Sequence, residues 1–240
     1  MITVLQWLAL AICVLCTLWR LPAARHGRNV SLCWCFGLCS IALGLSLPQI
    51  YLPVDAVLGG RNFANLVLRL IVYAIFFLLA LKLAAAYRSP RAASLIRGPV
   101  GASVLSLFIA GTVALFLASD LPQSRTGLAG YQQGQETVRY YALLGRVYPA
   151  YVAACLLLPT WRAARSAATA LNRTASATIF TALLLVAASA PLLVLALPTT
   201  FPLALLTYLA VLLMALGLTL VWISARSQSK LLARNPLMRQ

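Results

Sequence analysis

The sequence predicts an all-α polytopic membrane protein, a bundle of seven transmembrane helices. Hydrophobic residues make up 62% of the 240 residues and charged residues only 9%, a composition that a soluble globule could not bury. The apolar residues also form seven long stretches, and lysine and arginine gather in every second gap between them. The composition predicts the class, and the alternation of charge predicts the number of crossings and their direction.

Each apolar stretch is close to the length that a bilayer requires. A hydrocarbon core of about 30 Å is crossed by about 20 apolar residues in a helix. The first stretch is the shortest, but no basic residue precedes it, which favours a membrane span over a secretory signal. The predicted spans are residues 2–18, 30–51, 63–86, 100–118, 138–160, 176–197 and 202–224. No long linker interrupts them, so residues 1–240 are expected to form a single transmembrane domain with no soluble domain.

The distribution of basic residues predicts the orientation, because short loops rich in lysine and arginine stay in the cytosol. The first, third and fifth gaps and the C-terminal tail are the basic segments. Their cations are Arg20, Arg25, Arg28, Arg88, Arg91, Arg97, Arg162, Arg165, Arg173, Arg226, Lys230, Arg234 and Arg239. We therefore expect an N-terminus outside the cytosol, a cytosolic C-terminus, and all three carboxylates, Asp55, Asp120 and Glu136, on the outer side.

No catalytic, nucleotide-binding or metal-binding signature stands out, so neither an enzyme activity nor a cofactor is expected. The predicted spans carry no Asp, Glu or His at membrane depth to act as a base, metal ligand or proton carrier. Five of the six cysteines are spread over the first two spans, which favours apolar packing over a metal site. The net charge is +16, and the arginines that produce it flank the spans. We therefore expect contact with anionic lipid headgroups and no nucleic-acid binding.

Two polar stripes at the predicted outer ends of the third and fifth spans are the remaining candidates for function. Their members recur at helical spacing, and are Asn62, Asn65, Arg69 and Tyr73, then Glu136, Arg139, Leu143 and Arg146. At the rise of a helix, Arg69 and Arg146 each lie about 9–12 Å below the outer surface. An unpaired arginine at the centre of a span costs about 2.5–3.5 kcal/mol on insertion scales, so these two residues need an explanation.

A structural and a functional explanation both account for the two arginines. In the structural one, Arg69 and Arg146 snorkel to the headgroups or pair with Asp55 and Glu136, while Arg61 lies against Asp55. In the functional one, they line an outward-facing pocket for a carboxylate, a phosphate or a lipid headgroup, because a guanidinium binds an oxyanion through two hydrogen bonds. The candidate pocket consists of Arg69, Arg146, Asn65, Tyr73, Arg139 and Tyr148.

Two segments resemble a known family. Residues 54–66, Val-Asp-Ala-Val-Leu-Gly-Gly-Arg-Asn-Phe-Ala-Asn-Leu, resemble a recurring element in a family of actinobacterial multi-span membrane proteins described as transporters or proteins of unknown function. Residues 141–165 are similar to the later aromatic span of that family, which has a basic cytosolic end. The resemblance implies a seven-span bundle in an actinobacterial plasma membrane, and it implies no mechanism.

Two functions remain open at this point. The first is a non-enzymatic sensor or accessory subunit, in which a ligand near Arg69 and Arg146 shifts the helices and the basic inner loops report to a membrane or cytosolic protein partner. The second is a small permease for an anionic or amphipathic solute. The missing acid at membrane depth and the absence of an evident inverted repeat favour the sensor or subunit.

Overall fold

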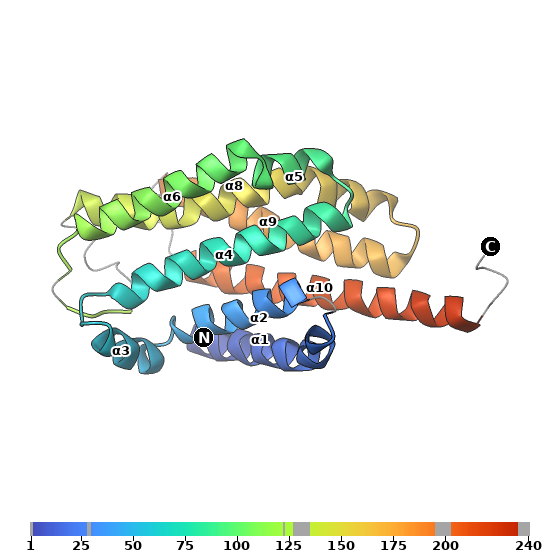
Figure 1. The fold of residues 1–240 in the computed structure, drawn as a ribbon, viewed down its shortest axis with the longest axis horizontal. Helices are drawn as coiled ribbons and strands as arrows, with labels where there is room; N and C mark the ends of the chain where they lie inside the picture. The colour runs from blue at the N-terminus through green and yellow to red at the C-terminus, as the bar shows by residue number, and fades with distance from the viewer. Residues whose placement is uncertain (1, 28–29, 122, 127–134, 195–202, 235–240) are drawn as a thin grey trace.

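The computed structural model describes residues 2–27, 30–121, 123–126, 135–194 and 203–234. Within these ranges the secondary structure is helical and contains no strand. The helices are α1 (Ile2–Arg25), α2 (Val30–Gly44), α3 (Pro48–Val57), α4 (Phe63–Ala86), α5 (Pro90–Arg97), α6 (Pro99–Leu117), α8 (Glu136–Ser166), α9 (Ala170–Val194) and α10 (Leu203–Arg234) (Figure 1).

Six of these helices are long and apolar enough to cross a membrane, and the number rises to seven if the bent pair α2 and α3 counts as one span. Large apolar side chains stay exposed along the middle of the bundle, including Leu107 on α6, Leu158 on α8 and Leu216 on α10. Such a surface is unfavourable in water and suits contact with lipid. The predicted all-helical, membrane-embedded class is confirmed, with six or seven candidate spans.

The second predicted span is not one continuous helix. Residues 30–51 were expected to cross as a unit, but α2 ends at Gly44 and α3 leaves at an angle of 91°. The cause is Pro48, which lacks an N–H and disfavours a helical conformation at Leu47, where the backbone is extended at φ −92° and ψ 128°. The 15 residues of α2 span only about 22 Å, so the pair is a broken span or a re-entrant segment.

Other helix ends also differ from the predicted boundaries. Helix α1 continues past residue 18 to Arg25, and α8 contains 31 residues because it extends beyond the apolar stretch at both ends. The short helix α5 was not predicted; Ser89 caps it by accepting a hydrogen bond from the Ala92 N–H, and Pro90 occupies its first turn. Arg28 and Arg239 lie outside the described residues, as do the side chains of Arg226, Lys230 and Arg234.

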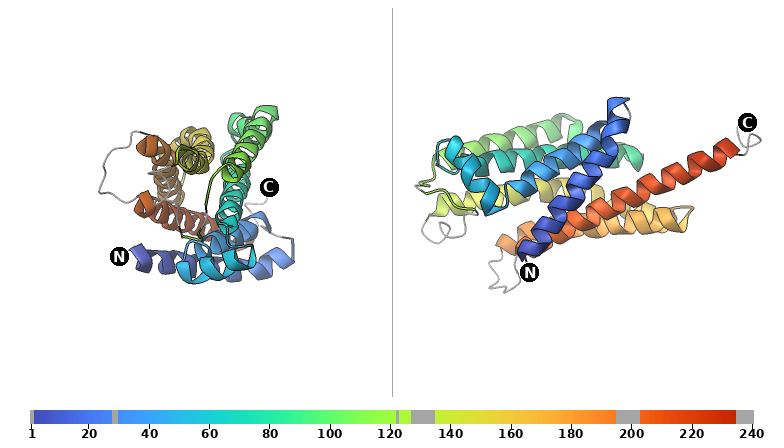
Figure 2. Two further views of the ribbon diagram at one scale, coloured as in Figure 1. Left: turned by 90° about the vertical axis from the view of Figure 1, so that its left-hand side faces the viewer. Right: turned by 90° about the horizontal axis from the view of Figure 1, so that it is seen from below.

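Six of the helices form a closed ring. Each of α1, α2, α4, α8, α9 and α10 packs against the next in that order, and α10 returns to α1. Helices α5 and α6 pack outside this ring against α4 and α8. Figure 2 (left) shows the arrangement end-on, with α1 and α2 along one side and α8 and α9 opposite. The ring places α4 beside α8, which determines what the two polar stripes can contact.

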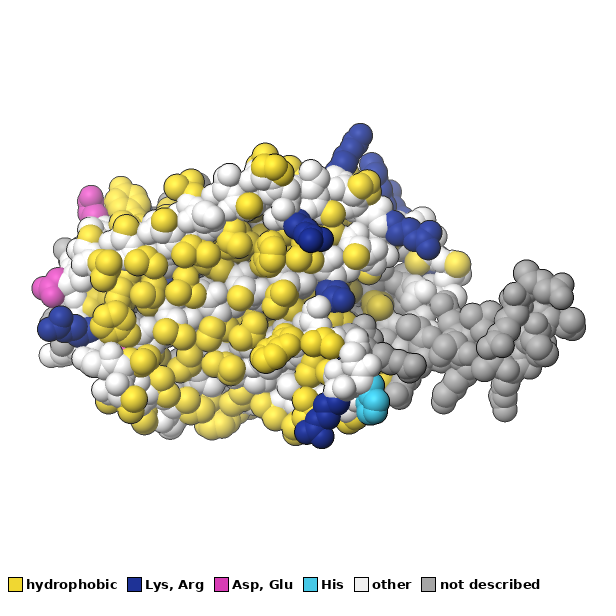
Figure 3. All heavy atoms as spheres, viewed as in Figure 1, with side chains coloured by type: hydrophobic (Ala, Val, Ile, Leu, Met, Phe, Trp, Pro, Cys, Tyr) yellow, Lys and Arg dark blue, Asp and Glu magenta, His cyan; other side chains and the backbone are white. Residues whose placement is uncertain are grey.

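The carboxylates lie at one end of the bundle. All three lie at the end that carries α3, together with arginines such as Arg61 and Arg139. The opposite end, which carries α5, holds the described arginines of the predicted cytosolic gaps, and no acidic side chain is visible there in Figure 3. We call these the α3 end and the α5 end. The alternation of basic gaps along the sequence therefore corresponds to a separation in space. Which end faces the cytosol stays a prediction.

Candidate functional site

Asp55 caps the start of α4 instead of contacting an arginine. Its fully buried carboxylate accepts hydrogen bonds from the backbone N–H groups of Asn62 and Ala64, each at 2.9 Å, and from the Ser124 hydroxyl. An anion at this position is favourable, because the first N–H groups of a helix have no partner within the helix. Arg61 is exposed, so the structure gives Asp55 backbone and hydroxyl partners in place of the expected guanidinium.

Asn62 forms a second junction at the α3 end. Its backbone is left-handed at φ 60°, a conformation that asparagine tolerates better than most residues. The buried side chain accepts hydrogen bonds from the Tyr51 hydroxyl at 2.9 Å and the Arg125 N–H at 3.0 Å, and donates to the Gln123 carbonyl at 2.7 Å. Asn62 thus joins α3, the start of α4 and the segment after α6, and is not part of a stripe facing α8.

Arg69 is fixed between α4 and α8 by uncharged partners. Its Nε donates to the Asn65 side chain at 3.1 Å, and its Nη1 donates to the Tyr141 carbonyl at 2.7 Å. The guanidinium also lies over the Tyr141 ring, 3.8 Å from the centroid, and the Tyr141 hydroxyl donates to Asn65 at 3.1 Å. Carbonyl dipoles and an aromatic face stabilise a cation without neutralising it.

Gly145 provides the space that Arg69 occupies. A Cβ atom at this position would overlap Arg69 Nη1. In an α-helix the carbonyl of Tyr141 is adjacent to residue 145, one turn later, so a glycine there leaves that carbonyl open from the side. Sequence reasoning singled out Arg69 but missed Gly145, and the only signal was a glycine in an otherwise regular helix beside Arg146.

Tyr73 and Tyr148 are packing residues between α4, α6 and α8. The Tyr73 hydroxyl donates to the Leu144 carbonyl at 3.1 Å and contacts the Thr112 hydroxyl at 2.8 Å. Its ring meets Tyr148 edge-on with centroids 5.0 Å apart, and both side chains are buried. The hydroxyl of Tyr73 therefore already has protein partners on two sides, which leaves it little capacity for a ligand.

Arg146 is half-buried and, among the described residues, has neither a hydrogen bond nor an ion pair. On α8 its side chain points in nearly the same direction as those of Val138, Ala142 and Ala153. All three are buried, so Arg146 leaves the helix on an inward face. The Arg69 guanidinium lies against Gly145, the residue that precedes Arg146 in α8. The structure thus brings the two predicted arginines close to each other.

The other charged residues of the second stripe do not join this pair. Arg139 and Glu136 are exposed at the start of α8. Asp120 is exposed too, and the Asp55 carboxylate accepts hydrogen bonds at the start of α4. None of the three carboxylates therefore neutralises the charge of Arg69 or Arg146. The candidate site is reduced to two neighbouring guanidiniums, of which one has protein acceptors.

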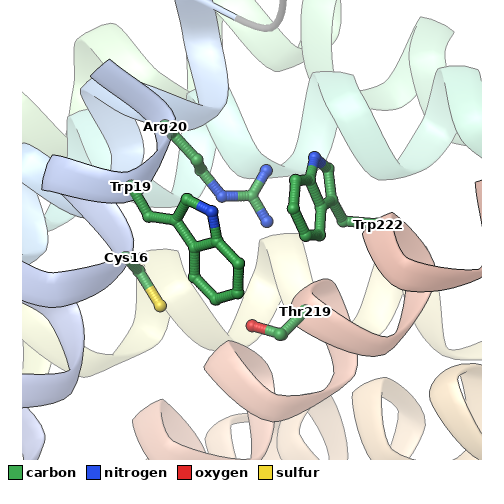
Figure 4. Close-up of a pocket in the computed structure, with 5 residues that line it drawn as sticks. All are labelled: Cys16, Trp19, Arg20, Thr219 and Trp222. Atoms are coloured by element: carbon green, nitrogen blue, oxygen red, sulfur yellow. The ribbon is translucent and has the colours of Figure 1, made fainter. Parts of the chain in front are cut away.

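Arg20 also has an inward role that its place among the cytosolic markers did not predict. It is buried where α1, α2 and α10 meet, with its guanidinium 5.2 Å from the centre of the Phe36 ring and 3.4 Å from the Leu218 carbonyl. The hollow beside it, between Trp19 and Trp222, has a volume of about 10 Å³ and is too small for a ligand (Figure 4). The signal in the sequence would have been a helix that continues beyond the apolar stretch.

No protein-family model, curated protein or solved structure matches this chain.

Proposed function

We propose that this chain is a non-enzymatic integral membrane protein, a sensor or accessory subunit, in which Arg146 binds an anionic or amphipathic ligand beside Arg69. The observation that carries the proposal is the state of Arg146. It is half-buried on an inward face of α8, follows the glycine against which the Arg69 guanidinium lies, and has no acceptor among the described residues. Arginines at membrane depth are costly, and they commonly mark a ligand or ion site.

An oxyanion would resolve the electrostatic imbalance of this pair. The partners of Arg69 are an amide oxygen, backbone carbonyls and a ring, so they leave its full positive charge in place. Two like charges close together in a medium of low dielectric constant repel each other and attract an anion. A carboxylate or phosphate can accept two parallel hydrogen bonds from the free guanidinium of Arg146. In this arrangement the charge of Arg69 attracts the anion, and Arg146 binds it directly through hydrogen bonds.

The surroundings of Arg69 support a signalling role. Arg69 and Tyr73 on α4 both donate to backbone carbonyls of α8, so the ligand would sit at a junction where two membrane helices are directly hydrogen-bonded. A change in the position of Arg146 then acts on both helices. Their far ends lie at the basic α5 end, where a partner with an acidic surface would bind.

The alternative function is a permease for the same anionic or amphipathic solute. One observation favours it, the 91° break between α2 and α3. Interrupted helices with backbone groups freed from intrahelical hydrogen bonds are common at the substrate sites of secondary transporters. The break lies in the half of the ring that contains α1, whereas Arg146 lies on α8. This separation is why we rank the sensor or subunit first.

A comparison of two dodecyl compounds tests the ligand charge in the detergent-purified full-length protein. We expect dodecyl phosphate to raise the Tm more than dodecanol does, and Arg146→Leu to remove that excess without lowering the Tm of the ligand-free protein. Arg139→Leu is the matched control, because Arg139 is exposed on the same helix about two turns earlier. Inorganic phosphate shows whether a free anion suffices. An equal excess in the wild type and in Arg146→Leu would refute the proposal, and loss of the folded variant would favour the structural explanation.

The sensor or subunit and the permease are separated by two further measurements. Crosslinking and co-purification from native membranes should yield a stoichiometric protein partner if the chain is a sensor or subunit. Sealed vesicles that contain only this protein should not accumulate butyl phosphate. Accumulation that Arg146→Leu abolishes would establish the permease and overturn our first choice.

A further inference from the structure

A second candidate site lies inside the helix ring, separate from the arginine pair. It is a cavity of about 260 Å³ between α1, α2, α4, α9 and α10, and no residue of α8 lines it. Its walls are formed by apolar side chains such as Phe36, Phe76 and Met214, and none of the described residues that line it is charged. The cavity is therefore unsuited to the anion that Arg146 would bind.

The size of the cavity and its apolar walls indicate an apolar occupant. An apolar cavity of about 150 Å³ stays free of water and can bind benzene, and this cavity is larger. Water would find few hydrogen-bonding partners on such walls, and an empty space would deprive the lining atoms of dispersion contacts. From Tyr208 to Leu218 the α10 wall extends for about 15 Å, which suits an extended hydrocarbon chain better than a compact ring.

The polar atoms of the cavity gather at the α3 end. Ser46 and Tyr208 line it there, and Gln6 Nε2 donates to the Tyr208 hydroxyl at 2.6 Å. The Tyr208 hydroxyl in turn points to Ser46 Oγ at 3.4 Å, which is long for a hydrogen bond between hydroxyls. A ligand oxygen closer to the Tyr208 hydroxyl would accept a shorter and stronger hydrogen bond from it. Thr207, which is exposed and also lines the cavity, marks an opening at the same end.

We propose that this cavity binds a neutral single-chain amphiphile, with its hydrocarbon tail along α10 and a hydroxyl or carbonyl head group accepting a hydrogen bond from Tyr208. The head group is neutral because no cation lines the cavity within the described part of the chain, and it is polar because the Tyr208 hydroxyl, whose contact with Ser46 is long, lies at the open end. The tail occupies the space between α2, α4 and α10, where these helices enclose the cavity. This site is independent of the anion site and does not require it.

Photolabelling tests the proposal in the full-length protein in lipid nanodiscs. A dodecanol that carries a diazirine in its tail should label residues of α2, α4 and α10 that face the cavity. The labelling should saturate, and unlabelled dodecanol should compete for it while dodecyl phosphate competes poorly. Arg146→Leu should label as the wild type does, which keeps this test distinct from the test of the anion site.

Two kinds of variant identify the cavity as the place of binding. Ala215→Phe fills it from α10 and should reduce the saturable labelling about tenfold, whereas Leu216→Phe, at the next position but exposed to lipid, should leave it unchanged. Ala210→Phe fills the same cavity if Ala215→Phe does not fold. Tyr208→Phe should weaken dodecanol binding about three- to tenfold and leave the binding of a dodecane probe unchanged, because only the hydroxyl contact is lost.

Several results would overturn the proposal. Labelling that does not saturate, or that the filled variants retain, would show that bilayer chains contact the helices without a specific site. Equal competition by dodecyl phosphate would refute the neutral head group. A preference for dodecanol over dodecane that is unchanged in Tyr208→Phe would refute the assigned hydrogen bond. Even if neither filled variant folds, Tyr208→Phe and the competition experiment in the wild type test the proposal.

Discussion

At the scale of single residues, the interaction that joins α4 to α8 depends on a position without a side chain. Arg69 reaches the Tyr141 carbonyl because Gly145 leaves that carbonyl uncovered. The sequence could predict that Asn65, Arg69 and Tyr73 share a face, since helical spacing alone decides it. It could not predict that Arg69 would bind backbone carbonyls, because every residue has one and only the packing of two helices shows which are accessible.

We expect Gly145→Ala to lower the free energy of unfolding by about 1–3 kcal/mol, because the added methyl group displaces Arg69 from α8. Gly37→Ala is the control: its new Cβ would lie 3.8 Å from the nearest atom, an ordinary contact, so no loss of stability is expected. Thermal or denaturant unfolding in detergent measures both. In an Arg69→Met background the cost of Gly145→Ala should largely disappear, and an unchanged cost there would show that another contact is responsible.

At the scale of helices, the sequence predicted α4 well and α2 poorly for a physical reason. The predicted limits of the third span, residues 63–86, coincide with those of α4, because polar residues precede the apolar stretch and a basic loop follows it. Hydropathy is continuous across residues 30–51, so a length criterion merges α2 with α3. The warning was Pro48, whose effect on the preceding residue is local and does not register in average hydropathy.

The junction between α3 and α4 leads to a prediction that separates helix capping from ion pairing. Asp55→Asn should lower the free energy of unfolding by about 1–3 kcal/mol, because the new amide N–H₂ would face the N–H groups that the carboxylate now accepts. Arg61→Leu should change it by less than about 0.5 kcal/mol, because Arg61 is exposed. Urea titration of both variants in detergent measures the difference. A larger loss of stability in Arg61→Leu than in Asp55→Asn would instead support the ion pair between Arg61 and Asp55 that the sequence suggested.

At the scale of the whole molecule, the ring gives the two candidate sites different neighbours. Helix α4 contributes to both: Arg69 and Tyr73 face α8, while Leu68 and Val72, each one position earlier, line the apolar cavity. Adjacent residues in a helix point about 100° apart, so one helix can serve two chemically different environments. The sequence could predict the polar face of this helix, but the cavity depends on how five helices meet and has no signature in any one of them.

The positions of the carboxylates and of the basic gaps at opposite ends of the bundle lead to a prediction of orientation. The α5 end carries the described arginines of the basic gaps and the α3 end carries the carboxylates, so basic short loops should hold the α5 end in the cytosol. A fluorescent reporter fused after Gln240 should therefore be active in the cytosol, because α10 runs from the α3 end to the α5 end. A tag inserted at residues 132–135, which precede α8, should be accessible from outside intact cells. A cytosolic tag together with an external reporter would reverse the orientation, and it would place Arg146 in the cytosolic half of the membrane, where an intracellular anion would be its ligand.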